Sequence, residues 1–332
     1  MNFFRKIINK IRKQDHLGAY IISRKPIILV SFWFDFLNNL EDIKAVLPAD
    51  KNVHFIFKIG FYKSSKDAAE IKTTIKELNQ KHPNYNFNFL ANSPEELENF
   101  QENGLNTLFC NQNAFLDENK YKINNKKPRY KAIYMARITP LKRYELATKV
   151  DNLFVIGSWK DAEVEYAKNI LKKCDPEKWI KRIPHFMVSK YMNQAQSGLA
   201  LSKIEGTMYV CTEYLLSGLP VVSSKSQGGR HIYFDDRYVT IAEDTPESVA
   251  EKVEEITSRD MDRKMIRENT INIMQNHRKK FIELINSIYK SEGVDRNFGN
   301  EWEDVFTHKL GLRMHVPRKI YKKRMLKKGM NL

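Results

Sequence analysis

The sequence predicts an α/β protein made of two Rossmann-like halves with a ligand cleft between them. Two observations carry this prediction. The chain has 332 residues, which is more than a single hydrophobic core usually supports, so two domains are expected. Short apolar runs also alternate with charged stretches of helical periodicity, and this alternation is typical of parallel sheets covered by helices.

Residues 26–125 carry the first series and are expected to form an N-terminal acceptor domain. The apolar runs at 27–32, 53–60, 85–91 and 105–110 are the expected strands. The first of them continues into FWFDFLNNLED, so no glycine-rich loop follows it. Residues 111–129 are polar, rich in lysine and end near a proline, which is typical of a linker between domains.

Residues 126–290 repeat the pattern and predict a C-terminal donor domain. Expected strands lie at 130–136, 153–158, 198–202 and 238–243, and expected helices cover 141–150 and 161–173. Residues 291–332 are expected to add a C-terminal helix and a basic tail. Because ligands bind beyond the carboxyl ends of parallel strands, we expect the functional residues at those ends.

The net charge of +16 is concentrated at the two ends of the chain. Residues 1–27 hold seven lysines and arginines and one aspartate, and residues 309–332 hold nine and no acidic residue. The near-neutral remainder argues against a basic groove for nucleic acid. Residues 1–25 also place phenylalanines and isoleucines on one helical stripe, so we expect a basic amphipathic arm that contacts an anionic membrane surface.

Several other classes of protein are disfavoured by the sequence. The longest apolar run, at 26–34, is too short to cross a bilayer, and no secretory signal is evident, so a cytoplasmic protein is expected. Three widely spaced cysteines indicate neither disulfides nor a zinc site. There is no dinucleotide-binding G-x-G-x-x-G and no P-loop. Asp260 and Asp262 form a D-x-D in a charged helical pattern, which indicates a solvent-exposed face, and no metal site is expected.

The strongest chemical pattern is SKIEGTMYVCTEYLLSGLPVVSSKSQGG, residues 202–229. Glu205 precedes a predicted helix and Glu213 lies about two turns into it, so both carboxylates can face a ligand. The helix N-terminus offers backbone amides that suit a phosphate, and a Gly-Gly pair adds a second amide-rich loop. The expected donor-binding residues are Glu213, Gly206, Thr207, Met208, Tyr209, Gly228 and Gly229.

Two cations precede this stretch. Arg137 ends a predicted strand, and Lys142 follows five positions later at the expected start of a helix. Together they could clamp a diphosphate that the helix N-terminus also binds.

This ordered set of motifs resembles the group 1 glycosyltransferases, family 4, which have the GT-B fold. The shared elements are R-x4-K, E-x7-E, S-G-L-P-V-V and G-G, and they cover roughly residues 130–256. The resemblance implies that Arg137 and Lys142 neutralise the donor phosphates. It also implies that Glu213 holds the ribose and that Glu205 contacts the donor sugar, which makes Glu205, Arg137 and Lys142 the expected catalytic residues.

The resemblance implies a retaining hexosyltransferase that needs no metal or other cofactor and uses a nucleotide-diphosphate sugar. The acceptor would be a glycan or a lipid-linked glycan in cell-surface polysaccharide synthesis, at the inner face of the membrane. His54, His185 and His231 are assigned no role. Two alternatives stay open: a non-catalytic GT-B partner subunit that binds nucleotide sugars, suggested by the missing N-terminal glycine loop, and a nucleic-acid-binding protein, suggested by the lysine-rich ends.

Overall fold

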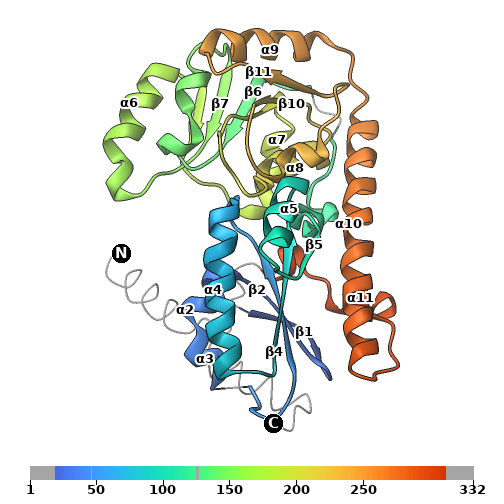
Figure 1. Cartoon of the computed structure of the whole chain (residues 1–332). Helices are drawn as coiled ribbons and strands as arrows, with labels where there is room; N and C mark the ends of the chain where they lie inside the picture. The colour runs from blue at the N-terminus through green and yellow to red at the C-terminus, as the bar shows by residue number, and fades with distance from the viewer. Residues whose placement is uncertain (1–18, 46, 125–126, 312–332) are drawn as a thin grey trace, which may run out of the picture. The chain divides into compact units, whose positions relative to one another are not determined.

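The computed structural model describes residues 19–45, 47–124 and 127–311 of the chain. They form two compact units, one of residues up to Phe115 with those from Arg278, the other of Leu116–His277 (Figure 1). The sequence pattern had suggested boundaries at 125/126 and 290/291. Residues 1–18 and 312–332 lie outside the described part, so the expected amphipathic arm and basic tail stay predictions.

The first unit is built on a five-stranded sheet in the order β1-β2-β3-β4-β5. Strands β2 to β5 are parallel, whereas β1 pairs antiparallel with β2. Residues 19–24, which the sequence pattern assigned to the basic arm, are therefore an edge strand of this sheet. The strands are β1 (Ala19–Arg24), β2 (Ile27–Phe32), β3 (Val53–Lys58), β4 (Tyr85–Ala91) and β5 (Thr107–Phe109).

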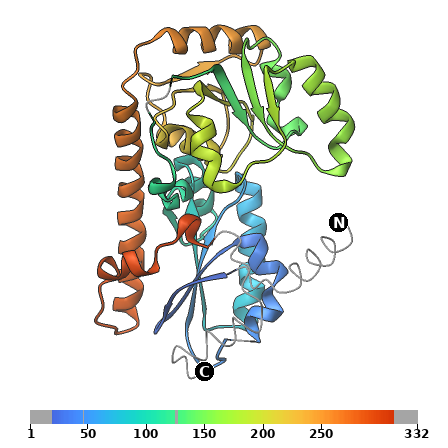
Figure 2. The same ribbon diagram turned by 180° about the vertical axis from the view of Figure 1, so that it is seen from behind.

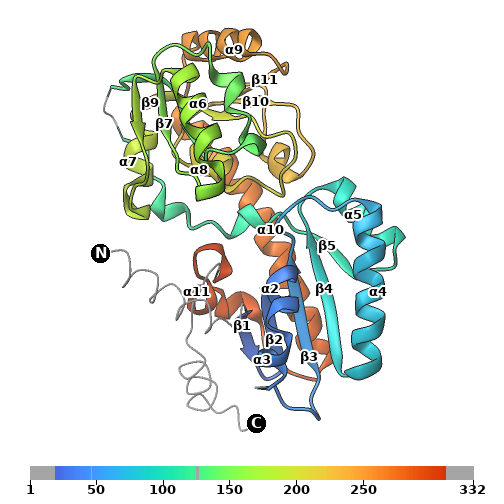
Figure 3. The same cartoon turned by 90° about the vertical axis from the view of Figure 1, so that its left-hand side faces the viewer.

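Helices cover one face of this sheet because its parallel strands follow one another in sequence order and their crossovers share one hand. These helices lie together on one side of the sheet (Figure 3). Their side chains pack with Leu29 of β2 in a single core, whereas its neighbour Ile28 belongs to a second core. Ser64 and Ser93 cap the two longest. The helices are α2 (Trp33–Asn38), α3 (Leu40–Lys44), α4 (Ser65–Lys81) and α5 (Pro94–Glu102).

The second face of the sheet is covered by the end of the chain. Helix α10 (Arg263–Ser291) begins in the second unit, and its last turns bury Phe281 and Ile285 against this face. Aromatic residues that follow complete the same core, so these residues belong to the first unit. The aromatic residues lie in η8 (Phe298–Glu301), in α11 (Trp302–Val305) and in the residues between α11 and η9 (His308–Leu310).

Residues 111–115, expected to begin a linker, are instead buried in the first unit. Asn111 and Gln112 are at most 2% exposed, and η1 (Gln112–Phe115) follows directly after β5. The Asn111 side chain donates to the carbonyl of Asn92 at 2.8 Å, and Gln112 donates to that of Ile59 at 2.9 Å. The linker prediction was wrong here because the polar side chains bond buried backbone carbonyls rather than water.

Figure 2 shows the second unit from behind. This unit contains a six-stranded, fully parallel sheet in the order β11-β10-β9-β6-β7-β8. The chain starts in the centre at β6, winds outward to β8 and returns to β9 on the other side of β6. The strand order therefore reverses between β6 and β9, and ligands of such sheets bind at this point. The strands are β6 (Tyr130–Met135), β7 (Leu153–Ile156), β8 (Lys178–Ile180), β9 (Ala195–Ala200), β10 (Val221–Ser224) and β11 (Val239–Ala242).

The helices of the second unit follow its strands, with one departure from the prediction. They are α6 (Val164–Cys174), α7 (Val188–Met192), α8 (Tyr209–Leu216) and α9 (Pro246–Ser258). The helix expected over 141–150 is wrong, because two short 3-10 turns, η3 (Pro140–Lys142) and η4 (Tyr144–Ala147), replace it. Arg143 between them has a φ of 52°, which no α-helix accommodates. Among the described helices, none has the length and apolar character of a membrane span.

The Asp260 and Asp262 pair lies in the connection between α9 and α10, not in a helix. Asp262 Oδ1 accepts hydrogen bonds from the amides of Lys264 and Met265 at 2.9 and 3.2 Å, so it caps α10. Within the described ranges, no group of three or more His, Cys, Asp or Glu residues is arranged to hold a metal ion.

Candidate functional site

The predicted site residues gather at the carboxyl ends of three neighbouring strands in the second unit. Arg137 and Lys142 follow β6, Glu205 follows β9, and Gly228 and Gly229 follow β10. These strands flank the point where the strand order reverses, which is where a ligand is expected.

Lys142 and Glu205 are in direct contact at this edge. The Lys142 ammonium donates to Glu205 Oε1, and the two side chains are only 18% and 10% exposed. Burial, with the positive charges of Arg230 and Arg137, lowers the pKa of Lys142 to about 8. The adjoining carboxylate favours the charged ammonium, so we expect an ion pair at neutral pH.

Arg137 lies in the same loop but is more accessible. Its side chain is 48% exposed, and its Nε lies 3.9 Å from Glu163 Oε1 in η5 (Asp161–Glu163). This long, exposed pair contributes little to stability, so the guanidinium is accessible to an anionic ligand.

Helix α8 is fixed to the sheet by Tyr214. The Tyr214 hydroxyl accepts a hydrogen bond from the amide of Met135 at 2.8 Å and donates to the carbonyl of Ile133 at 3.3 Å. A Cβ at Gly198 in β9 would lie 2.4 Å from the Tyr214 ring, so the glycine makes room for it. The sheet thereby sets the height and rotation of the helix that carries Glu213.

Glu213 is 7% exposed, so it does not lie on a solvent-exposed face of α8. Tyr121 lies next to its carboxylate, and burial together with Glu213 raises the pKa of the Tyr121 phenol. The same two causes raise the pKa of Tyr209, one helical turn before Glu213. Tyr121 was missed in the sequence because it lies in the segment that looked like a linker.

Helix α8 begins later than predicted. Its first residue is Tyr209, and Met208 before it has a φ of 49°, so Gly206, Thr207 and Met208 form a loop rather than a helical turn. Thr207 and Met208 are 2% and 6% exposed, respectively. Of the expected helix-end amides, only that of Tyr209 belongs to the helix itself.

The loop that contains Gly228 and Gly229 is hydrogen-bonded to the loop that carries Glu205. The Glu205 amide donates to the carbonyl of Gln227 at 3.1 Å, and the Gly229 amide donates to that of Gly206. Gly228 has a φ of 109°, and a Cβ there would lie 1.7 Å from the Glu205 carbonyl oxygen. The Gly229 amide, expected to face a ligand, is thus used within the protein.

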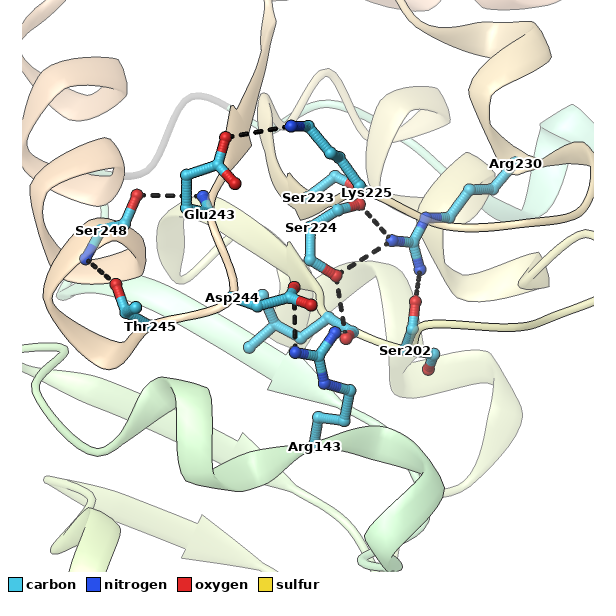
Figure 4. A network of polar contacts seen from close by, with 11 residues as sticks. Arg143, Ser202, Ser223, Ser224, Lys225, Arg230, Glu243, Asp244, Thr245 and Ser248 are labelled. Atoms are coloured by element: carbon cyan, nitrogen blue, oxygen red, sulfur yellow. Dashed lines mark hydrogen bonds and ion pairs between the residues drawn. The ribbon is translucent and has the colours of Figure 1, made fainter.

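Three charged residues of the site had no recognised sequence pattern. Arg230, directly after the two glycines, is 1% exposed and donates to the carbonyls of Ser202 and Ser224 (Figure 4). Burial lowers its pKa to about 10, so it keeps its charge. Arg143 pairs with Asp244, which follows β11, at 2.9 Å. The only sequence signal that could have marked these three residues as part of the site is their position shortly after predicted strands.

Comparisons with known proteins show similarity to glycosyltransferases. The family model described as "Glycosyl transferases group 1" matches residues 116–273. HepE of Anabaena in complex with UDP is similar over 71% of this chain and 72% of its own, with 16% identity and a TM-score of 0.55. Sucrose-phosphate synthase of Thermosynechococcus elongatus is similar over 83% and 72%, with 12% identity and a TM-score of 0.53.

The pneumococcal O-GlcNAc transferase GtfA, in complex with UDP and GlcNAc, is also similar, with 12% identity over 72% of this chain and a TM-score of 0.52. This chain spans about half the length of some of these proteins, 52% of GtfA and 48% of TarM from S. aureus, for which the identity is 14% and the TM-score 0.49. No curated protein matches the chain by sequence.

Proposed function

We propose that this chain is a retaining hexosyltransferase. It belongs to the group 1 glycosyltransferases through residues 116–273 and has the GT-B fold. It would transfer a hexose from a nucleotide-diphosphate sugar to a glycan or lipid-linked acceptor with retention of configuration. The observation that supports it most is the buried contact of Lys142 with Glu205 where the strand order reverses. A carboxylate and cations that meet at the carboxyl ends of a doubly wound sheet suit a sugar diphosphate.

In this proposal, Arg137 and Lys142 neutralise the diphosphate. Negative charge develops on the leaving diphosphate as the glycosidic bond breaks, and preorganised cations stabilise it. Because the protein itself supplies these positive charges, we propose that the reaction requires no metal ion or other cofactor.

Glu205 would contact the donor sugar and Glu213 the ribose hydroxyls. Both residues are 7% exposed, so their carboxylates are held rather than solvated, and a buried carboxylate gains from the hydroxyl donors of a sugar. The amide of Tyr209 at the start of α8, with the preceding loop from Gly206, would approach the pyrophosphate. Gly228 and Gly229 would act indirectly, by shaping that loop.

The acceptor side rests on the sequence alone. The basic residues of 1–27 and 309–332, most of them outside the described part, would bring the enzyme to an anionic membrane face where a lipid-linked acceptor is available, as in cell-surface polysaccharide synthesis. Sedimentation with vesicles of phosphatidylglycerol tests this: binding that disappears in neutral vesicles supports it, and no binding to either overturns it.

The enzymatic proposal is tested with the full chain and a panel of nucleotide sugars. UDP-glucose and UDP-GlcNAc come first, because HepE and GtfA have been seen with UDP. We expect donor hydrolysis or transfer that Glu205→Gln lowers by at least about a hundredfold. Lys149→Met, an exposed lysine paired with Glu247, is the matched control and should keep full activity.

The outcomes of this experiment separate the alternatives. Turnover that depends on Glu205 supports the proposal. Tight UDP binding without turnover of any donor overturns it in favour of a non-catalytic nucleotide-sugar-binding subunit, and turnover that Glu205→Gln leaves unchanged overturns the assigned site.

A further inference from the structure

Arg230 is a fully buried cation in the second unit. It is 1% exposed, and among the described residues no carboxylate forms an ion pair with it. Its Nε has no hydrogen-bond partner within the described part of the chain. Removing a guanidinium from water is costly, so a charge kept here must serve a structural or functional purpose.

The contacts of Arg230 join two strands. Nη1 donates to the Ser202 carbonyl at 2.8 Å, directly beyond β9, and Nη2 donates to the Ser224 carbonyl at 2.6 Å, at the end of β10. Figure 4 shows the guanidinium between these two backbone segments. Arg230 therefore ties together the starting points of the two loops that follow these strands.

The loop after β9 and the loop after β10 also form backbone hydrogen bonds with each other. The Gln227 amide donates to the Lys203 carbonyl at 3.0 Å, and the Glu205 amide donates back to the Gln227 carbonyl at 3.1 Å. The same two loops are thus held together twice: by the Arg230 guanidinium where they begin, and by these backbone hydrogen bonds further along. Glu205, which contacts Lys142, is one of the residues that form these backbone hydrogen bonds.

Arg230 also acts on Lys142 through its charge. The positive charge of Arg230 is the largest cause, after burial, of the lowered pKa of Lys142. The charged groups that face the Lys142 ammonium are Glu205, Arg230 and Arg137. Loss of the guanidinium would therefore alter both the position of Glu205 and the acidity of its partner.

We propose that Arg230 is a positioning residue for glycosyl transfer: by holding the Ser202 and Ser224 carbonyls, its guanidinium fixes the Glu205 carboxylate in contact with Lys142. This inference rests on the proposed function, because it assigns the Glu205 and Lys142 contact to the donor site. It predicts an effect on the chemical step rather than on nucleotide binding, because Arg137 and Glu213 are carried by other elements.

The test compares Arg230→Met and Arg230→Lys with the full wild-type chain. In Arg230→Met, we expect kcat for hydrolysis of UDP-glucose or UDP-GlcNAc to fall at least about tenfold, while the dissociation constant of UDP changes less than about threefold. The upper limit of the pH profile should move upward in this variant, because the pKa of Lys142 rises. Arg230→Lys keeps the charge and should keep the wild-type pH limit, with a kcat between the two.

Arg263→Met is the matched control. Arg263 is a half-buried arginine of the same unit that also donates to backbone carbonyls, those of Gly218 and Ser217, away from the Glu205 loop. It should lose stability but keep the wild-type kcat and pH profile. Wild-type kcat in Arg230→Met, or the same changes in Arg263→Met, would overturn the proposal.

A second readout does not depend on turnover. Amide hydrogen exchange of Glu205 and Gln227 should be at least about tenfold faster in Arg230→Met than in the wild type and unchanged in Arg263→Met. Equal exchange in all three overturns the positioning role. If the wild type turns over neither donor, the proposed function is contradicted but the positioning role is not. Amide hydrogen exchange then still tests whether Arg230 fixes the Glu205 loop. If Arg230→Met does not fold, Arg230→Lys carries the exchange comparison.

Discussion

Lys142 and Glu205 form a largely buried ion pair in the second unit although 63 positions separate them in the chain. One residue follows β6 and the other follows β9, so the pair bridges the two strands between which the strand order reverses. The pair compensates two charges that would otherwise be costly to bury. A donor diphosphate that binds Lys142 would share this cation with Glu205.

Removal of both partners of this pair should destabilise the protein less than the sum of the two single removals. Lys142→Met leaves an unpaired buried carboxylate, and Glu205→Gln leaves an unpaired ammonium, so we expect each to lower the free energy of unfolding by about 2–4 kcal/mol. In the double variant, the loss should fall short of the sum by at least about 1 kcal/mol. Urea unfolding of the four proteins measures this, and strictly additive losses would contradict the buried pair.

Gly228 should tolerate no side chain, whereas Gly293 should tolerate one. Both have a positive φ, of 109° and 67°, but a Cβ at Gly228 would collide with the Glu205 carbonyl and one at Gly293 meets nothing within 4 Å. We expect Gly293→Ala to cost about 1–2 kcal/mol of stability and to keep activity. Gly228→Ala should cost at least about 3 kcal/mol and displace Glu205.

Thermal unfolding and donor hydrolysis check this comparison. Similar losses of stability in the two variants would mean that the close approach of the two loops is unimportant.

Glu213 should determine how the site recognises the ribose. In the wild type, we expect UDP to bind at least about tenfold more tightly than 2′-deoxy-UDP or 3′-deoxy-UDP, because the hydroxyls donate to a buried carboxylate. Glu213→Gln should reduce that preference and leave affinity for the deoxy nucleotide within about threefold of the wild type. Calorimetric titration of each protein with each nucleotide measures these dissociation constants, and an unchanged preference in Glu213→Gln would assign the ribose to other residues.

Lys58 should make the stability of the first unit depend on pH. Burial lowers its pKa from 10.5 to about 7, and Lys309 adds to this while Asp35 opposes it. Between pH 7 and 10.5 the unfolded chain therefore binds more protons at Lys58 than the folded chain does. The free energy of unfolding should rise with pH in this range, by up to about 1.4 kcal/mol per pH unit, and the full cost of the buried charge remains below pH 7.

Lys58→Met should lack this rise, whereas Lys66→Met, at an exposed position on α4, should keep it. Urea unfolding at pH 6.5, 7.5, 8.5 and 9.5 gives the difference between each variant and the wild type. A difference for Lys58→Met that stays constant across this range would show that Lys58 is charged when folded.

The sequence allowed good prediction where local chemistry decides the structure. The motif S-G-L-P-V-V predicted a helix end and a buried strand, and α8 ends at Leu216, Gly218 has a φ of 67°, and β10 begins at Val221. The two glutamates were interpreted as a site rather than a solvated face, and both are buried. Their burial follows from the strand before them and from the Tyr214 anchor on the sheet.

Features set by distant contacts could not be predicted in this way. The left-handed backbone of Met208 delays the start of α8, and that of Arg143 interrupts the helix expected over 141–150. Neither residue type signals that conformation. Arg230 was not recognised in the sequence because its role depends on hydrogen bonds to the carbonyls of Ser202 and Ser224, which only the fold brings within reach. Tyr121 was missed because the lysines and asparagines after it resemble a linker.

Titration of the full chain with UDP at pH 7 tests the central claim most directly. If the contact of Lys142 with Glu205 marks the donor site, the wild type and the exposed-lysine control Lys149→Met should bind UDP equally well, and Lys142→Met should bind it at least about tenfold more weakly. UDP binding that Lys142→Met leaves unchanged, or no binding by the wild type, would contradict the account.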